Sequence, residues 1–298
     1  ALSSAASDVY KRQLYGDGFE SRCEMALESG RWFVRVTMPE EAAALWYVFR
    51  LGLAGGEYWL CAGQGGRFGQ LMSSRGEGFR LTVYERGFET PAWFRRSVMY
   101  QIFPDRFARD WSDTARDGIE KHREMGRQVK FHEDWGESVD WQPNSADGFY
   151  FPLDFYGGTL RGIAGRLNYL RDLGVSVIYL NPVFEACSNH RYDTADYLNI
   201  DPILGTNEDF ENLCTNAERL GIRIMLDGVF SHTGADSIYF NKFSHYPDAG
   251  AYNAGESSPY YGWYDFRRYP QEYRCWWNFP DLPEVNEHDP LWQKMIIT

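Results

Sequence analysis

The sequence predicts an α/β protein in which a small β-sandwich precedes a unit of parallel β/α construction, and three observations support this. Short β-like runs separated by glycine-rich turns fill residues 14–90, with no convincing helix between them. From residue 91 onward, apolar strands alternate with amphipathic helices, which is typical of a parallel sheet. An aromatic-rich stretch, residues 233–288, then interrupts this alternation.

The first unit is defined by its β-like runs. Residues 1–13 lack apolar periodicity, so we expect them to form a tail. Four runs that follow are rich in β-branched and aromatic residues: Arg31–Met38, Leu45–Leu51, Glu57–Cys61 and Phe79–Tyr84. Strands this short and this closely spaced predict the sandwich. The stretch Gly87–Pro91 is typical of a linker.

Three apolar runs in the second unit predict buried strands, at Val98–Phe103, Val175–Leu180 and Ile222–Leu226. Residues 108–150, between the first and second runs, are polar, highly charged and irregular. We therefore expect a long loop there.

Two helices are expected between these strands and a third near the end of the chain. Apolar residues recur at spacings of three and four over Thr159–Leu173 and again over Thr206–Leu220. Thr206 and Asp209 have the spacing of a capping box, which predicts where the second helix begins. Asp289–Thr298 opens as an amphipathic helix and then stops, which we interpret as a truncation.

Composition excludes several classes of partner. The chain has 298 residues, 30 basic against 42 acidic side chains, and a net charge of −12, which disfavours binding to nucleic acid or anionic membranes. No apolar run approaches the ~18–20 residues that span a bilayer. The aromatic content of 17% suits either sugar recognition or a large core, and composition does not separate the two.

The five cysteines are scattered and include no Cys-x-x-Cys pair, so they indicate neither a disulfide framework nor a zinc site. We expect free thiols in a reducing compartment and therefore a cytoplasmic protein. No secretion signal is visible, but the chain lacks an initiating Met, so an extracellular location stays open.

Chemically versatile side chains follow the predicted strands, and ligands bind at the carboxyl ends of strands in parallel β/α folds. Asp105 follows the first strand beside Arg106, where a structural ion pair is the favoured interpretation. His190, Tyr192 and Asp193 follow the second strand, and this group either grips hydroxyls or is a solvated polar loop. The third strand leads into Asp227, with His232 five residues on, and the position of Asp227 favours a functional role.

These segments, in this order, resemble glycoside hydrolase family 13, the α-amylase superfamily, over roughly residues 90–298. The likeness is strongest to the neopullulanase, cyclomaltodextrinase and maltogenic amylase group. The strings that carry it are VMYQIFPDRF, GGTLRGIAGRLNYLRDLGVSVIYLNPVF, SNHRYDTADYLNIDP, DGVFSH and LPEVN. The resemblance implies a (β/α)8 TIM barrel, of which residues 91–298 hold about three strands, with domain B inserted at about 233–288.

The resemblance also implies roles for particular residues. It places Tyr192 against the sugar ring at the cleavage subsite, with His190 beside it. It implies that Asp227 organises the site and that His232 binds the same sugar. Asp193, in the same loop, is a further candidate for substrate binding.

The implied activity is hydrolysis of α-1,4 and also α-1,6 glucosidic bonds in maltodextrins, starch or cyclodextrins by a retaining mechanism. The resemblance places the two catalytic carboxylates beyond Thr298, so the chain alone is predicted to be inactive. An alternative is a non-catalytic carbohydrate-binding or scaffold protein with the same fold. Transfer of glucosyl units instead of hydrolysis is a third alternative that no residue here decides.

The resemblance implies no required cofactor and a homodimer formed through the N-terminal domain. Some members bind calcium, but the family often has Asn where Ser231 stands, and Thr159 replaces a carboxylate that often binds the ion. Calcium needs about six or more oxygen ligands. Asp110, Asp113 and Gly157 are the remaining candidate ligands.

Overall fold

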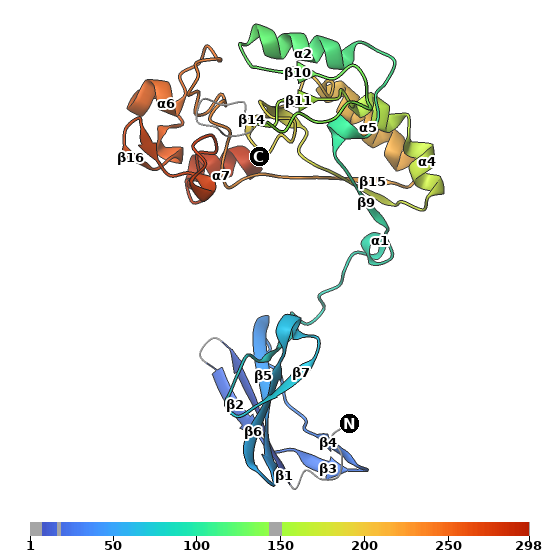
Figure 1. Cartoon of the computed structure of the whole chain (residues 1–298), viewed down its shortest axis with the longest axis vertical. Helices are drawn as coiled ribbons and strands as arrows, with labels where there is room; N and C mark the ends of the chain where they lie inside the picture. Colours follow the sequence, from blue (N-terminus) through green and yellow to red (C-terminus); the bar gives the residue numbers. More distant parts are fainter. Residues whose placement is uncertain (1–7, 17–18, 143–150, 298) are drawn as a thin grey trace. The chain divides into compact units, whose positions relative to one another are not determined.

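The computed structural model describes residues 8–16, 19–142 and 151–297 and divides the chain into two compact units, Ala1–Ala92 and Trp93–Thr298. The division lies close to the expected boundary after residue 90. Figure 1 shows an all-β N-terminal unit and a mixed α/β second unit.

The strands of the N-terminal unit pair in one antiparallel sheet with the order β2-β1-β5-β6-β7, and β8 also pairs with β5. A separate hairpin joins β3 to β4. The strands are β1 (Asp8–Gly16), β2 (Phe19–Cys23), β3 (Ala26–Glu28), β4 (Arg31–Phe33), β5 (Ala43–Leu53), β6 (Gly56–Ala62), β7 (Gly69–Met72) and β8 (Phe79–Val83).

Three expectations for this unit are not met. A sandwich needs two stacked sheets, whereas the described residues form one six-stranded sheet and a hairpin. Residues 1–13 were expected to be a tail, but β1 begins at Asp8 and pairs with β5, because backbone pairing with a long central strand needs no apolar alternation. The expected strand over Arg31–Met38 is shortened to β4.

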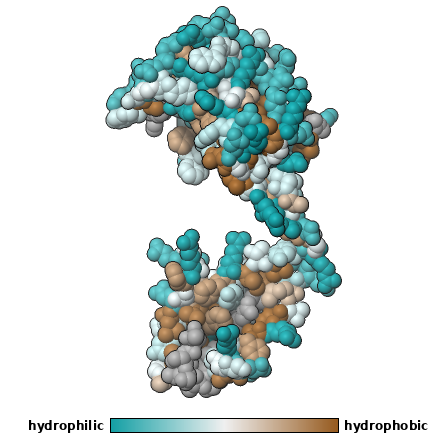
Figure 2. Space-filling model, turned by 90° about the vertical axis from the view of Figure 1, so that its right-hand side faces the viewer, coloured by the Kyte–Doolittle hydropathy of each residue, from teal (hydrophilic) through white to brown (hydrophobic). Residues whose placement is uncertain are grey.

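From residue 21 to residue 92, where burial is described, the N-terminal unit buries few large apolar side chains. Leu45, Val48 and Leu51 of β5 are buried together with Cys61. Other large apolar side chains remain exposed, and Figure 2 shows them as brown areas on the surface of this unit. Phe68, for example, is 78% exposed.

Three parallel strands form the central sheet of the second unit: β9 (Met99–Ile102), β12 (Val177–Leu180) and β15 (Arg223–Leu226). Their order is β15-β12-β9, so strands that follow one another in the sequence lie side by side. In this register Leu180 pairs with both Ile102 and Leu226, so the three carboxyl ends meet at one edge. All three predicted strands are confirmed, but the described residues do not form a closed barrel.

The helices of the second unit are α1 (Ala92–Arg95), α2 (Thr114–Glu124), α3 (Leu160–Ala164), α4 (Leu167–Asp172), α5 (Asn207–Arg219), α6 (Ala251–Ala254) and α7 (Pro290–Ile297). The predicted capping box of α5 is present, since the Thr206 side chain and Asp209 each bond the other's backbone N–H. Among the described residues, no helix has the length and apolarity needed to cross a bilayer.

Two helix predictions need correction. The helix expected over Thr159–Leu173 is broken into α3 and α4, because Gly165 caps the first and Arg166 departs from helical geometry. The region 108–150, expected to be a loop, contains α2. That helix buries Ala115, Gly118, Ile119 and His122, of which only Ile119 is a large apolar residue. Its sequence therefore shows no clear apolar period.

The main core packs helices against the central sheet. Ile178 and Leu180 of β12 are fully buried with Ile163 of α3, Leu170 of α4 and Leu213 of α5. Figure 1 shows α4 and α5 together on one side of the sheet. This packing fixes the strand ends from which the functional side chains extend.

The remaining short strands pair in three groups: β10 (Lys130–Phe131) with β11 (Asp154–Phe155), β13 (Phe184–Ala186) with β14 (Thr194–Ile200), and β16 (Phe266–Arg268) with β17 (Glu272–Tyr273). The segment that follows β15 builds a second core from aromatic side chains, including Phe240 and Trp263, with Trp292 of α7. Figure 1 shows α6, β16 and α7 gathered in this part of the unit. Its assignment as domain B stays a prediction.

Gly118 of α2 provides a test of how this helix packs. A Cβ added there would lie 2.3 Å from the Pro202 carbonyl oxygen and 2.4 Å from the Ile203 Cα, so the helix and that backbone could not both keep their positions. We expect Gly118→Ala to lower the free energy of unfolding by about 1–3 kcal/mol. Gly165→Ala is the matched control, because its Cβ would meet nothing closer than 3.5 Å. Equal urea midpoints for the two variants would contradict this packing.

Candidate active site

A chain of hydrogen bonds joins the carboxyl ends of the three parallel strands. The Tyr192 hydroxyl donates to Asp227 Oδ2 at 2.8 Å, directly after β15. Asn181, directly after β12, donates from Nδ2 to the Tyr192 hydroxyl at 3.3 Å. Gln101 of β9 donates to Asn181 Oδ1 at 2.9 Å. The structure thus brings Tyr192 and Asp227 together and holds them on the sheet.

Two tyrosines, Tyr192 and Tyr179, lie near the Asp227 carboxylate. Burial, and then the hydrogen bond to Asp227, raises the pKa of Tyr192 to about 12. Burial and the neighbouring Asp227 also raise the pKa of Tyr179 above its ordinary value. Tyr192 therefore stays protonated at neutral pH and acts as a donor to a half-buried carboxylate.

His232 is buried beside this pair with one ring nitrogen available. Its Nδ1 lies 3.0 Å from the Ser231 hydroxyl, and its ring centroid lies 5.3 Å from that of Trp276. Burial lowers the pKa of His232, partly offset by the nearby Tyr192 backbone, so the ring is neutral at pH 7. The Nε2 atom is buried and makes no hydrogen bond of normal geometry with the described residues.

His190 lies next to Tyr192 and holds its backbone. The Tyr192 N–H donates to His190 Nδ1 at 3.1 Å, and the two ring centroids are 5.7 Å apart. Burial lowers the pKa of His190, and the nearby Asp193 carboxylate partly offsets this. The neutral tautomer with a free Nδ1 lone pair therefore fits the hydrogen bond.

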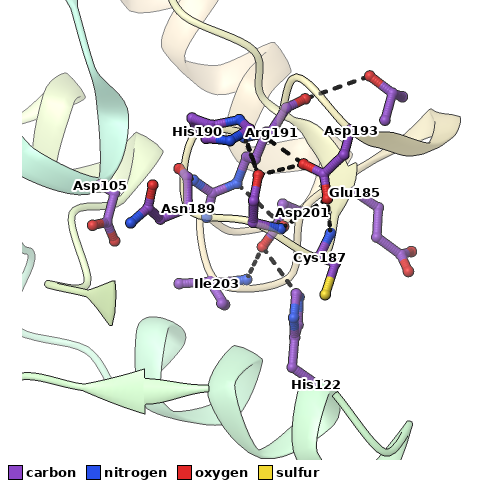
Figure 3. A network of polar contacts seen from close by, with 12 residues as sticks. Asp105, His122, Glu185, Cys187, Asn189, His190, Arg191, Asp193, Asp201 and Ile203 are labelled. Carbon is purple, nitrogen blue, oxygen red and sulfur yellow. Dashed lines mark hydrogen bonds and ion pairs between the residues drawn. The ribbon is translucent and has the colours of Figure 1, made fainter. Parts of the chain in front are cut away.

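Asp193 is turned toward its own loop. Its Oδ2 accepts from the backbone N–H groups of Cys187 at 3.2 Å and Ser188 at 3.1 Å, and its Oδ1 accepts from the Ser188 hydroxyl. Figure 3 shows these contacts closing the loop. Asp193 was predicted to bind substrate, but in this geometry its oxygens shape the loop that carries Tyr192. Sequence spacing could not show which way the carboxylate points.

The loop is anchored by a buried ion pair that sequence analysis missed. Arg191 Nε lies 3.2 Å from Asp201 Oδ2, and both side chains are fully buried. His122 of α2 approaches Asp201 Oδ1 at 3.5 Å, and Arg191 donates to the Asn189 carbonyl at 2.7 Å (Figure 3). Burial alone would raise the pKa of Asp201, but Arg191 and His122 outweigh it and hold that pKa well below its usual range.

The candidate calcium ligands are engaged with protein. Asp110 Oδ2 accepts from the Ser112 hydroxyl at 2.7 Å, and Asp113 lies 3.7 Å from Arg116. The Gly157 N–H donates at 3.0 Å to Asp105, a fully buried carboxylate that also pairs with the neighbouring arginine at 2.7 Å, as favoured above. Within the described ranges, no three His, Cys, Asp or Glu side chains cluster as metal ligands would. Whether the protein binds calcium stays a prediction.

A cleft of about 590 Å³ lies beside Ser231, the residue before His232, and His232 itself does not line it. Ser231 and Glu284 line it, and Glu284 also forms a backbone bridge to His232. Arg274 and Asp265 make its wall charged. Tyr192 and Asp227 are not among its lining residues, so this cleft is a neighbour of the hydrogen-bonded site.

A family described as the catalytic domain of α-amylase matches residues 101–294, well over half of the chain. The chain belongs to the α-amylase family, glycoside hydrolase family 13. Its relatives include an amylopullulanase of Thermoanaerobacterium saccharolyticum, 42% identical over 268 residues, covering 85% of this chain. The intracellular maltogenic amylase of Bacillus subtilis (strain 168) is 36% identical over 213 residues, covering 70% of this chain.

Solved structures of the same enzyme types resemble this member of the α-amylase family. The type III pullulan hydrolase from Thermococcus kodakarensis has a TM-score of 0.60 and 25% identity, and the match covers 98% of this chain and 49% of that one. The cyclic α-maltosyl-(1→6)-maltose hydrolase from Arthrobacter globiformis has a TM-score of 0.53 and 31% identity, covering 69% and 40%.

The chain spans 20% of the length of that amylopullulanase and 31% of that maltogenic amylase. The activity of any whole protein that contains it is therefore a matter for proposal.

Three supporting residues escaped sequence analysis, each for a different reason. Asn181 stands in an Asn-Pro step after a strand, and nothing in that step shows which side chains it bonds. Arg191 lies inside the predicted sugar-binding loop, where a charged residue is expected to face solvent. Asp201 precedes Pro202 in what resembles an ordinary turn. Only the fold brings Arg191 and Asp201 together in the interior.

Replacing Asp201 tests the anchor. Asp201→Asn leaves the buried Arg191 charge uncompensated, so we expect the free energy of unfolding to fall by about 3–5 kcal/mol at pH 7. Because the pKa of Asp201 is depressed by folding, its contribution is present above about pH 4 and is lost as the pH falls further. Urea unfolding from pH 3 to 7 should show a steeper acid loss for the parent chain than for the variant.

Asp113→Asn is the control for this experiment, because the Asp113 side chain is 78% exposed and its ion pair is weak. If Asp201→Asn and Asp113→Asn changed the free energy of unfolding equally, the Arg191–Asp201 pair would not hold the loop as described.

Proposed function

We propose that the chain contributes the substrate-binding side of a retaining glycoside hydrolase. On this proposal the whole protein cleaves α-1,4 and also α-1,6 glucosidic bonds in maltodextrins, starch or cyclodextrins. The observation that carries it is the convergence of Tyr192, Asp227 and His232 at the carboxyl edge of a parallel sheet in an α-amylase family chain.

The chemistry of these groups suits a sugar. The Tyr192 ring offers an apolar face to the apolar face of a pyranose. Asp227 accepts hydrogen bonds, and the neutral His232 Nε2 can pair with a hydroxyl. The ionised Asp227 and the neutral His232 can both form these hydrogen bonds without a bound metal ion. We therefore propose an activity that requires no cofactor.

Relatives whose names refer to pullulan, cyclomaltodextrin and maltogenic activity support an α-glucan as the substrate class. Nucleic acid and anionic membranes have no place in this proposal, because the net charge is −12. A cytoplasmic location and a homodimer formed through the N-terminal unit complete it.

A retaining mechanism uses two carboxyl groups about 5–5.5 Å apart, one as nucleophile and one as acid and base. On this proposal both come from barrel strands that follow β15, in sequence beyond Thr298. The chain alone would then bind α-glucans without cleaving them. Asp227 organises the sugar and is not the nucleophile.

Substitutions at Asp227 and His232 test this assignment in the full gene product. We expect Asp227→Asn and His232→Ala each to lower kcat/KM on maltoheptaose by about a hundredfold or more, because both lose contacts to the reacting sugar. Thermal midpoints should change far less than activity does. Asp172→Asn on the exposed end of α4 is the matched control.

Unchanged turnover in both variants would refute the site. If the parent protein bound maltoheptaose but never cleaved it, the protein would be a non-catalytic carbohydrate-binding protein and the proposed enzymatic function would be wrong.

A further inference from the structure

A row of aromatic rings leads outward from His232. The His232 and Trp276 ring centroids are 5.3 Å apart, and the Trp276 and Trp277 centroids are 4.8 Å apart. The two indoles are nearly parallel, with 5° between their planes. His232 is buried, whereas Trp277 is 77% exposed, so the row runs from the interior to the surface.

The backbone holds Trp277 in an unusual conformation. Its φ is +49°, and that of the following Asn278 is +62°. Asn tolerates the left-handed region, but an aromatic residue there costs about 1–2 kcal/mol. Short backbone bonds tie the turn, from Trp276 N–H to the Leu282 carbonyl at 2.9 Å and from Phe279 N–H to the Trp276 carbonyl at 3.0 Å.

Burial of a large indole would normally offset the conformational energy of a left-handed backbone, but Trp277 is exposed. Its conformation therefore needs another explanation. Stacking on Trp276 fixes one face of Trp277 and leaves the ring pre-organised. A rigid flat apolar surface next to a hydroxyl-binding site matches the alternating apolar faces and polar rims of a sugar chain.

We propose that Trp277 is an outer subsite that stacks against a glucose unit of an α-glucan chain. The inner unit of the same chain sits at Tyr192, Asp227 and His232. This inference rests on the proposed function and adds a determinant of chain length to it. It is distinct from the inner site, since Trp277 reaches His232 only through Trp276.

A glucan fits this surface better than a protein partner does. A stable protein interface buries about 800 Å² on each side with several anchors. The exposed apolar surface here is essentially Trp277 with Phe279, which is 47% exposed. The nearby cleft wall is charged, with Arg274 and Glu284, which suits sugar hydroxyls and opposes a large apolar partner.

The test compares chain lengths in the full gene product. KM and the calorimetric Kd are measured for maltotriose and maltoheptaose in the parent protein, Trp277→Ala, Trp277→Phe and the control Tyr169→Ala. Tyr169 is an exposed aromatic residue on α4, at 56% exposure, outside the row. We expect Trp277→Ala to weaken maltoheptaose relative to maltotriose by about tenfold, because one stacked ring contact is lost.

Trp277→Phe, which keeps a flat ring, should restore most of the preference, and Tyr169→Ala should keep the parent ratio. An unchanged ratio in Trp277→Ala, with or without a loss of thermal stability, would overturn the subsite while leaving the proposed function intact. If the Trp277→Ala variant kept the parent ratio but unfolded at a lower temperature, the Trp277 ring would contribute to stability and would not bind the glucan. If the parent protein neither bound nor cleaved either oligosaccharide, both proposals would fall.

Discussion

The buried pair between Arg191 and Asp201 is the constraint on which the candidate site depends. Arg191 is flanked in sequence by His190 and Tyr192, and its own backbone is left-handed, with φ +61°. The ion pair holds the backbone at Arg191 in place. The neighbouring rings of His190 and Tyr192 are therefore restricted in where they can lie. Isolating two charges from water is costly, and their attraction repays this only with good geometry and further hydrogen bonds. The Asn189 carbonyl supplies one such bond, and this arrangement gives the loop a single shape.

The sheet provides the second fixed point, and the hydrogen-bond chain from β9 to Asp227 connects it to the loop. Side chains on three strands cannot move independently when each donates to the next. A further buried pair, Arg127 with Asp236 at 2.7 Å, ties the segment after α2 to the segment after β15. His232 lies four residues before Asp236, so the same attachment restrains the histidine. The side chains of Tyr192, Asp227 and His232 are therefore positioned by segments that the ion pairs Arg191–Asp201 and Arg127–Asp236 hold in place.

Sequence analysis predicted the three parallel strands, and it named Tyr192 and Asp227, which the structure brings together, because apolar runs and strand-end positions depend on local order. Their role in binding substrate stays a prediction. It missed α2, since a helix whose buried face includes Gly118 and His122 lacks an apolar period. It predicted a sandwich from strand spacing, but spacing says nothing about whether strands share one sheet. The direction of the Asp193 carboxylate and the pairing of Arg191 with Asp201 depend on contacts between distant segments. No window of sequence contains that information.

The bonding partners of the aspartates indicate which of them hold the structure together and which can bind a ligand. Asp105 and Asp236 each accept a hydrogen bond from an arginine, and charge-assisted bonds of this kind are roughly twice as strong as neutral ones. Asp201 forms a buried ion pair with Arg191. A ligand hydroxyl could not displace such a partner. Asp227 instead meets the hydroxyl of Tyr192, a neutral donor that a sugar hydroxyl can match in kind. A sugar hydroxyl that replaced this one neutral donor would leave no buried cation unpaired, so Asp227 is suited to receive a substrate, whereas the arginine-paired aspartates are suited to hold the structure in place.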